Sequence, residues 1–234
     1  MKEIFPGSSL MIKEPIQRGC WLLLGPPGSG KSTFCLHFLK AGLINTQPCV
    51  IVATDYSPEE VKSGMKRLGV NVTLLEDQSR FRIVDCYSWR TGARSTSPYH
   101  VDNPANLSDV SIAIENARRG LRNPRVVCDS ITTLTLETGE ASAQKFLQVL
   151  TAKIKEVNGM GILVAEAGIH REEFVTFLRY TCDGVFEMKI EEAKGDLRRS
   201  FRIYFLKGIK HSDAWFPYIF NGENIMVGAA PVSP

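Results

Sequence analysis

The chain has 234 residues, of which 44% are hydrophobic and 23% charged, and its formal net charge at pH 7 is +3. These values fit a globular α/β protein with a large core, and so small a charge gives no support to a nucleic-acid partner. We see no signal peptide and no apolar run that could span a membrane, and six scattered cysteines without CxxC spacing argue against zinc sites and disulfides. We therefore expect a cytoplasmic protein.

Short apolar runs alternate with helical patterns along the first two thirds of the chain. The runs have continuous rather than alternating apolar residues, which is typical of parallel strands buried on both faces. Crossover helices between such strands produce this alternation. We expect the strands at 20–25, 48–55, 81–86, 124–130 and 160–167. We expect the main helices at 32–43, 57–69, 106–121 and 141–157.

The longest connection and the C-terminal part follow other patterns. Residues 88–106 are rich in Ser, Pro, Arg and Asn, and so long a loop in a compact domain is either functional or mobile. Residues 184–208 form two strand-like runs around "EEAKGD", and 215–227 suggest a second hairpin that turns at Asn221-Gly222. We expect a single domain over 1–234, with a core at about 16–190 and antiparallel hairpins at about 184–227.

The segment "LLLGPPGSGKSTF" contains G-x-x-x-x-G-K-[ST] without a mismatch, after a strand and before a helix. In this phosphate-binding loop, or P-loop, the glycines let backbone N–H groups point at phosphate, and the helix N-terminus adds positive charge. Lys31 would reach the outer phosphates, and the Ser32 hydroxyl would ligate Mg²⁺. The alternative is a Gly-rich turn that binds nothing. The predicted nucleotide-binding residues are Gly25, Pro26, Pro27, Gly28, Ser29, Gly30, Lys31, Ser32 and Thr33.

Asp129 ends the apolar strand "RVVCD". Its carboxylate would emerge at the carboxyl edge of the sheet, where such folds place the acids that order Mg²⁺. We therefore predict Ser32 and Asp129 as the metal-binding pair. The alternative for Asp129 is a cap on the next segment.

The ordered set of motifs resembles the RecA superfamily and, within it, the archaeal KaiC-like group of RecA/RadA-type ATPases. The resemblance rests on the P-loop, "CVIVATDYSPEEV", "VVCDSITTL" and the late hairpin "CDGVFEMKIEEAKGDLRRSFRIYFLKGIKH", and it covers about 16–227. It implies a RecA-like three-layer sandwich: a mainly parallel twisted sheet flanked by helices, with antiparallel strands at the C-terminal edge. It also implies ATP and Mg²⁺ at the subunit interfaces of a homo-oligomer, of which a hexamer is one form.

This sequence departs from the group at the predicted catalytic residues. Where the group usually has two glutamates after the second strand, this chain has Asp55 and Tyr56. Asp55 is the candidate base, but its side chain is one methylene shorter, and a misplacement of order 1 Å can cost on the order of a hundredfold in rate. We therefore expect slow hydrolysis. The alternative for Asp55 is a cap on the following turn.

The resemblance also assigns a cation that the neighbouring subunit would supply. Lys207 is the candidate, because a positive charge there would offset charge on the γ-phosphate oxygens. Phe205 fills the second position that is usually basic, and a solvated lysine is the alternative for Lys207. Glu166 ends the strand after that of Asp129, where the superfamily often has a residue that senses the γ-phosphate.

Four functions compete. The first is a KaiC-like regulatory or signalling ATPase with a protein partner. The second is a RadA-like DNA-binding recombinase paralogue, which is disfavoured because Arg90 and Arg94 belong to no sustained basic run. The third is a small-molecule phosphotransferase, for which no arginine-rich lid is evident. The fourth is a scaffold that binds ATP without turnover, which the Asp55-Tyr56 pair favours.

Overall fold

In the computed structural model, residues 3–193, 195–221 and 224–229 are described, and their strands form one sheet. The order across the sheet is β10-β9-β8-β7-β1-β6-β5-β2-β3-β4. The strands are β1 (Gly19–Gly25), β2 (Cys49–Ala53), β3 (Phe81–Asp85), β4 (Tyr99–His100), β5 (Arg125–Asp129), β6 (Met160–Glu166), β7 (Gly184–Ala193), β8 (Asp196–Leu206), β9 (Phe216–Phe220) and β10 (Ile225–Val227).

The strands from β7 to β4 in this order run parallel to one another, and β8, β9 and β10 add antiparallel pairs at one side. All five strands expected within residues 20–167 are present. Because parallel strands end at the same edge, β1, β2, β5 and β6 deliver Gly25, Ala53, Asp129 and Glu166 to one edge of the sheet.

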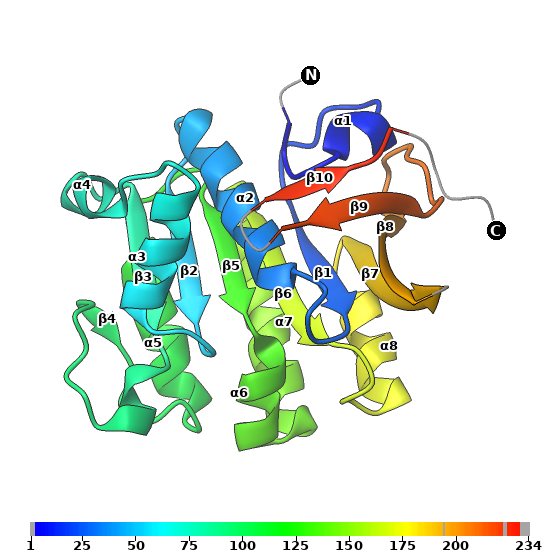
Figure 1. Ribbon diagram of the computed structural model, residues 1–234. Coiled ribbons are helices and arrows are strands. Elements are labelled where there is room, and N and C mark those ends of the chain that lie inside the picture. Colours follow the sequence, from blue (N-terminus) through cyan, green and yellow to red (C-terminus); the bar gives the residue numbers. More distant parts are fainter. Residues whose placement is uncertain (1–2, 194, 222–223, 230–234) are drawn as a thin grey trace.

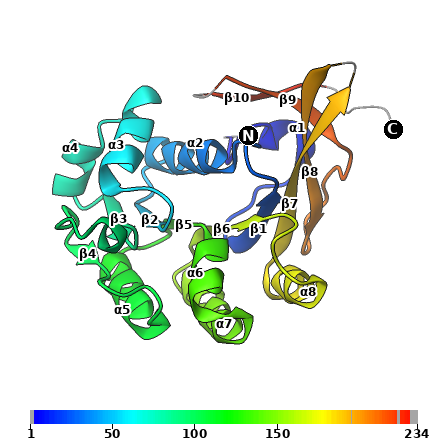
Figure 2. The same cartoon turned by 60° about the horizontal axis from the view of Figure 1, so that its bottom comes forward.

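Helices cover both faces of the sheet, so that the parallel core has three layers (Figures 1 and 2). Helices α1 to α4 pack on one face and α5 to α8 on the other. One hydrophobic cluster lies under each set of four helices. The helices are α1 (Ser8–Met11), α2 (Lys31–Ile44), α3 (Pro58–Arg67), α4 (Val72–Asp77), α5 (Leu107–Arg118), α6 (Ile131–Thr138), α7 (Glu140–Glu156) and α8 (Glu172–Thr181). Among the described helices, none is long and apolar enough to cross a bilayer.

Local capping explains where two of these helices begin. At α3, the Ser57 side chain accepts from the Glu60 N–H while the Glu60 side chain accepts from the Ser57 N–H, a reciprocal capping box. Helix α6 was not expected, because "ITTLTLET" is rich in β-branched residues that favour strands. The Ser130 side chain accepts from the Thr133 N–H and so starts the helix directly after β5.

Part of the long connection at 88–106 has regular secondary structure, so its irregular part is shorter than the sequence suggests. It contains a 3₁₀ helix at Ser88–Thr91 and the strand β4, which pairs with β3. Asp85, which is 1% exposed, accepts hydrogen bonds from the Tyr87 and Ser88 N–H groups and from the Ser88 and Ser95 hydroxyls. These bonds lower the pKa of Asp85 although its burial acts in the opposite direction. One buried carboxylate therefore organises the start of the loop.

Both predicted C-terminal hairpins are present as β7–β8 and β9–β10. Lys194 in the first turn and Gly222 in the second lie outside the described residues. Strand β9 turns back across the α2 side of the sheet (Figure 2), which brings this late segment to the predicted P-loop.

Candidate functional site

The predicted P-loop connects the end of β1 to the start of α2, as the sequence pattern requires. Gly28 and Gly30 have φ angles of +78° and +83°, a left-handed conformation that side chains with a Cβ disfavour. A Cβ on Gly25 would lie 2.9 Å from both the Met188 Cβ and the Ser29 Oγ. The glycines of the motif are thus required by the backbone curl itself.

Strand β9 braces this loop from the side. The Tyr218 hydroxyl donates to the Ser29 carbonyl oxygen, and the Phe220 ring lies 3.4 Å from where a Cβ on Gly30 would stand. Burial raises the pKa of Tyr218 to about 12, so the phenol keeps the proton that it donates. The sequence predicts a hairpin here but not these two contacts, because Tyr218, for example, lies 189 positions from Ser29.

Lys31 is held by acceptors within the site. Its Nζ donates to the Pro26 carbonyl oxygen and to Glu166 Oε2, each at 2.9 Å, and the side chain is 5% exposed. A glutamate at position 166 would be unfavourable beside a phosphate unless a lysine or Mg²⁺ stood between them. The structure supplies that lysine, which pairs directly with Glu166.

Ser32 and Asp129 meet beside Lys31. Ser32 and Asp129 line the same cavity, where the Ser32 hydroxyl opposes the rise in the pKa of Asp129, and this hydroxyl donates to the Tyr56 hydroxyl at 3.3 Å. Asp129 is 4% exposed, and its burial, together with the nearby Asp55 and Glu166, raises its pKa to about 6 against the opposing effects of Ser32 and Lys31. A buried carboxylate with this pKa favours binding of a cation that replaces its proton.

Asp55 lies at the same edge but is held by hydroxyl groups of α6. Its Oδ1 accepts from Thr133, and its Oδ2 accepts from Ser130 at 3.0 Å. It does not cap α3, because Ser57 does so. Hydroxyl donors on both of its oxygens therefore orient the carboxylate.

A second chain of hydrogen bonds leads from this edge towards α7 and α8. The Thr132 hydroxyl accepts from the Glu166 N–H at 2.9 Å and lies 2.8 Å from His170 Nε2. Nε2 of a neutral imidazole can donate to this hydroxyl or accept from it, depending on the tautomer. Burial lowers the pKa of His170, which is consistent with that form. No sequence signal pointed to Thr132 or His170.

The donor set at this edge fits Mg²⁺, because a hydroxyl and a carboxylate are the oxygen ligands that the ion prefers. A cavity of about 320 Å³ opens directly beside it between α2 and α3, and it is lined by Ser32, Tyr56 and Asp129 among others. The backbone curl at Gly28 and Gly30 fits phosphate for the reasons given above. The residues present therefore fit both a nucleotide phosphate chain and its metal ion.

Lys207 is the one predicted catalytic residue that lies elsewhere. It follows β8 and lines a shallow hollow together with Gly19, at the amino end of β1, while the P-loop starts at Gly25. A strand of this length spans about 20 Å at about 3.3 Å per residue. Its Nζ donates to the Tyr180 carbonyl oxygen at 3.2 Å. Lys207 therefore cannot contact the P-loop of its own chain.

Comparisons with known proteins agree with this architecture. The model of the KaiC ATPase family matches residues 12–231. A UPF0273 protein of Methanocaldococcus jannaschii is 26% identical over 231 residues, which cover 97% of this chain and 95% of the relative. A UPF0273 protein of Pyrococcus furiosus is 28% identical over 232 residues, with 97% and 93% covered.

The fold also matches a solved structure. The crystal structure of a KaiC-like protein from Pyrococcus horikoshii aligns with a TM-score of 0.74 over 97% of this chain and 98% of that one, at 21% identity. At that identity the likeness concerns the fold alone. It confirms the predicted RecA-like arrangement, with a mainly parallel sheet, flanking helices and antiparallel C-terminal strands.

Proposed function

The chain belongs to the KaiC ATPase family, and from this premise we propose that it binds Mg–ATP in its P-loop and hydrolyses it slowly between two copies of itself. Membership supports nucleotide binding and an ATPase-type activity. The Mg²⁺ site, the slow rate, the shared site and the treatment of 1–234 as one ATPase domain are our proposals, and each is argued from particular residues.

ATP binding would use backbone N–H groups of the loop. The N–H groups around Gly28 and Gly30 and the N-terminus of α2 offer partial positive charge to the phosphates. Lys31 would leave Glu166 and donate instead to the outer phosphates, which is a stronger partner for an ammonium group. The brace from Tyr218 and Phe220 would keep the loop in the conformation that binds.

Ser32 and Asp129 would hold the Mg²⁺ ion, which when bound neutralises charge on the phosphate oxygens. Asp129 loses its proton more readily in that state, because the ion outweighs the burial that raises its pKa in this structure. Ser32 and Asp129 already line the same cavity, so one ion could be reached by both side chains.

The slow rate follows from the surroundings of the candidate base. Asp55 has a short side chain, and Thr133 and Ser130 occupy its two oxygens. To polarise a water molecule it must act from this hydrogen-bonded position. Tyr56, which stands where the family often has a second glutamate, remains a neutral phenol because burial raises its pKa.

A shared site follows from the position of Lys207. This side chain is exposed, and it lies about 20 Å from the P-loop of its own chain, by the length of β1 given above. It can act on bound ATP only from a neighbouring copy. Lys207 would then stabilise the charge that develops on the γ-phosphate oxygens.

The placement of Ser32 and Asp129 on the wall of one cavity beside Lys31 is the observation that carries this proposal. The test is ATP turnover against protein concentration for the wild type, Lys31→Ala and Lys207→Ala, alone and mixed in equal amounts. We expect turnover per chain to rise with concentration in the wild type and to be low in each variant. The mixture should regain activity, because an intact P-loop can then face an intact Lys207.

Two results would contradict the proposal in different ways. A mixture no more active than the average of its components would remove the shared site and the role of Lys207. ATP binding without phosphate release at any concentration would make the protein a scaffold. DNA-stimulated turnover would instead support the recombinase-like alternative.

A further inference from the structure

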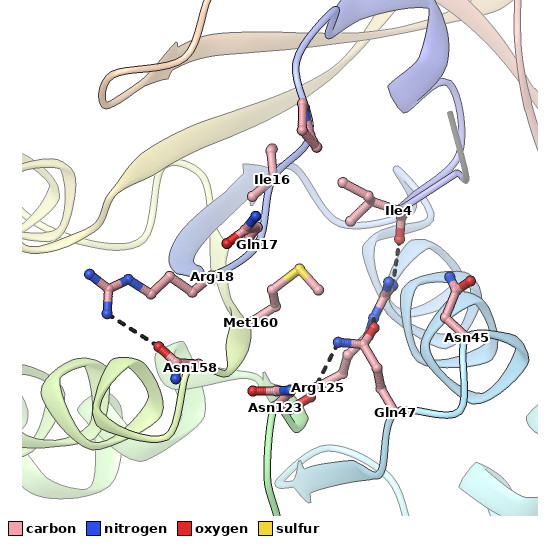
Figure 3. Close-up of a pocket in the computed structure, with 11 residues that line it drawn as sticks. Ile4, Ile16, Gln17, Arg18, Asn45, Gln47, Asn123, Arg125, Asn158 and Met160 are labelled. Carbon is pink, nitrogen blue, oxygen red and sulfur yellow. Dashed lines mark hydrogen bonds between the residues drawn. The ribbon is translucent and has the colours of Figure 1, made fainter.

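A second cavity lies at the opposite edge of the sheet from the P-loop, where β1, β5 and β6 begin (Figure 3). Its volume is about 700 Å³. The lining is unusual in its chemistry: two arginines and five primary amides surround an apolar patch, and none of the described lining residues carries a carboxylate. The polar members are Gln17, Arg18, Asn45, Gln47, Asn123, Arg125 and Asn158.

Among these residues, Arg125 has the largest free-energy cost of burial, because its charged guanidinium lies in the interior. It is 1% exposed and makes no ion pair within the described part of the chain. Its guanidinium donates to neutral oxygens only: Gln47 Oε1 at 2.9 Å and the Ile4 and Phe38 carbonyls at 2.7 Å each. Burial lowers its pKa to about 10, which records the cost of keeping the charge in the interior.

The helix beside Arg125 is adapted to this side chain. A Cβ on Gly42, within α2, would come 2.4 Å from the Arg125 Cδ, so no larger residue fits there without displacement. Glycine inside a helix costs about 1 kcal/mol relative to alanine. The fold thus accepts a helix glycine as well as a buried cation that has hydrogen bonds and the Phe38 ring, 4.6 Å away, but no ion-pair partner among the described residues.

Several hydrogen-bonding groups of the cavity are not used by the protein. The side-chain amides of Gln17 and Asn123 form no hydrogen bond with another described residue, and Asn45 Oδ1 is buried without a partner among them. Gln47 is different: Arg125 fixes its oxygen, and its Nε2 donates to the Asn123 carbonyl at 3.2 Å. Arg18 extends towards Asn158 Oδ1, 3.3 Å away, and is otherwise exposed (Figure 3).

We propose that this cavity binds a small molecule bearing an oxyanion, a carboxylate or a phosphate group, through Arg18 and the free amides, with Arg125 supplying positive charge from the cavity wall. An oxyanion would provide the counter-charge that Arg125 lacks. Arg18 has the planar fork that matches carboxylate and phosphate oxygens. The amides would bind the polar remainder of the ligand.

The test follows the side-chain amides of asparagine and glutamine by ¹⁵N NMR in the full chain. The probes are inorganic phosphate and, separately, succinate, at constant ionic strength so that screening does not change. We expect saturable shifts of the Gln17, Asn123 and Asn158 amides. Because the P-loop contains no Asn or Gln, phosphate bound there is not read directly, and Lys31→Ala should leave these shifts unchanged.

Two variants give the test a matched pair. Arg18→Gln removes an exposed lining cation and should weaken binding about tenfold, the value of one charge-assisted hydrogen bond. Arg122→Gln removes an exposed arginine near the cavity that does not line it, and it should change nothing. Both positions are exposed, so both variants should fold.

The two probes separate the sources of the oxyanion. Shifts with phosphate alone support a phosphate-bearing ligand, shifts with succinate alone support a carboxylate, and shifts with both support a site for either group. The proposal is overturned if neither probe gives a saturable shift, or if Arg18→Gln and Arg122→Gln bind each probe equally well.

Discussion

The two edges of the parallel sheet differ in the charges that line their main cavities. The carboxyl edge gathers three carboxylates, Asp55, Asp129 and Glu166, around the single ammonium of Lys31. The amino edge has the buried Arg125 and the exposed Arg18 in a cavity whose described lining has no acid, and the next hollow holds Lys207 together with Glu156 and Asp183. The first edge suits a polyphosphate that arrives with Mg²⁺, and the second suits an anion that arrives without a metal.

The largest expected effect comes from removing Lys31, the cation of the carboxyl edge. Lys31→Ala should weaken ATP binding about a hundredfold, because the ammonium would donate to more than one phosphate oxygen. Calorimetric titration of ATP measures the effect, with Lys40→Ala, a lysine on the same helix, as control. If the two variants bind ATP equally well, the loop is not a phosphate site.

Asp129→Asn tests whether the buried negative charge of Asp129 destabilises the fold when no cation is bound. The folded pKa of Asp129, about 6, lies above the unfolded value near 4, so its contribution to stability is fully present below pH 4 and is lost as pH rises through 6. Without Mg²⁺ or nucleotide, we expect Asp129→Asn to be more stable than wild type at pH 8 by up to about 3 kcal/mol.

Urea unfolding at several pH values measures this difference. The advantage of Asp129→Asn should shrink as the pH falls from 8 to 4, because the wild-type carboxyl group then becomes neutral. Two outcomes would contradict this prediction: a stability difference that does not change between pH 8 and pH 4, or a variant that is less stable than wild type at pH 8. Either would show that burying the charged form of Asp129 does not destabilise the fold.

Glu166→Gln tests whether the ion pair between Glu166 and Lys31 competes with phosphate binding. The variant removes the ion pair that ATP must displace from Lys31, so we expect ATP to bind about tenfold more tightly. The matched control is Glu137→Gln, at an exposed position on α6. Unchanged affinity in Glu166→Gln would mean that this ion pair does not compete with phosphate.

The smallest expected effect concerns the brace on the loop. Tyr218→Phe removes one hydrogen bond to Ser29 and should lower the free energy of unfolding by about 1 kcal/mol. Tyr204→Phe, at an exposed tyrosine, is the control. Equal stability of the two variants in urea unfolding would show that the Tyr218 hydroxyl does not stabilise the loop.

The parts of this site that sequence could predict are local. The curl from Gly25 to Ser32 and the emergence of Asp129 at a strand end follow from motif spacing and from the geometry of parallel strands. The pairing of Lys31 with Glu166 and the brace from Tyr218 are contacts over 135 and 189 positions, which no short pattern encodes. Helix α6 was missed because its Ser130 cap outweighs the strand preference of "ITTLTLET".

The sequence did not predict the cavity at the amino edge, because its main sign is a buried arginine without an ion-pair partner. Arg125 is the first residue of an apolar strand and reads as an ordinary polar start. Only the packing of Ile4, Phe38 and Gly42 around it shows that the charge is buried. A buried cation without a carboxylate can be recognised only once the neighbours from distant segments are known.

The central claim is that Ser32 and Asp129 together hold the Mg²⁺ of a nucleotide bound at Lys31. Its most direct test is calorimetric titration of ATP with and without Mg²⁺ for wild type, Ser32→Ala and Asp129→Asn. The account predicts that Mg²⁺ strengthens ATP binding in the wild type, and that both variants lose this gain while they still bind metal-free ATP. A full gain from Mg²⁺ in Asp129→Asn would contradict it.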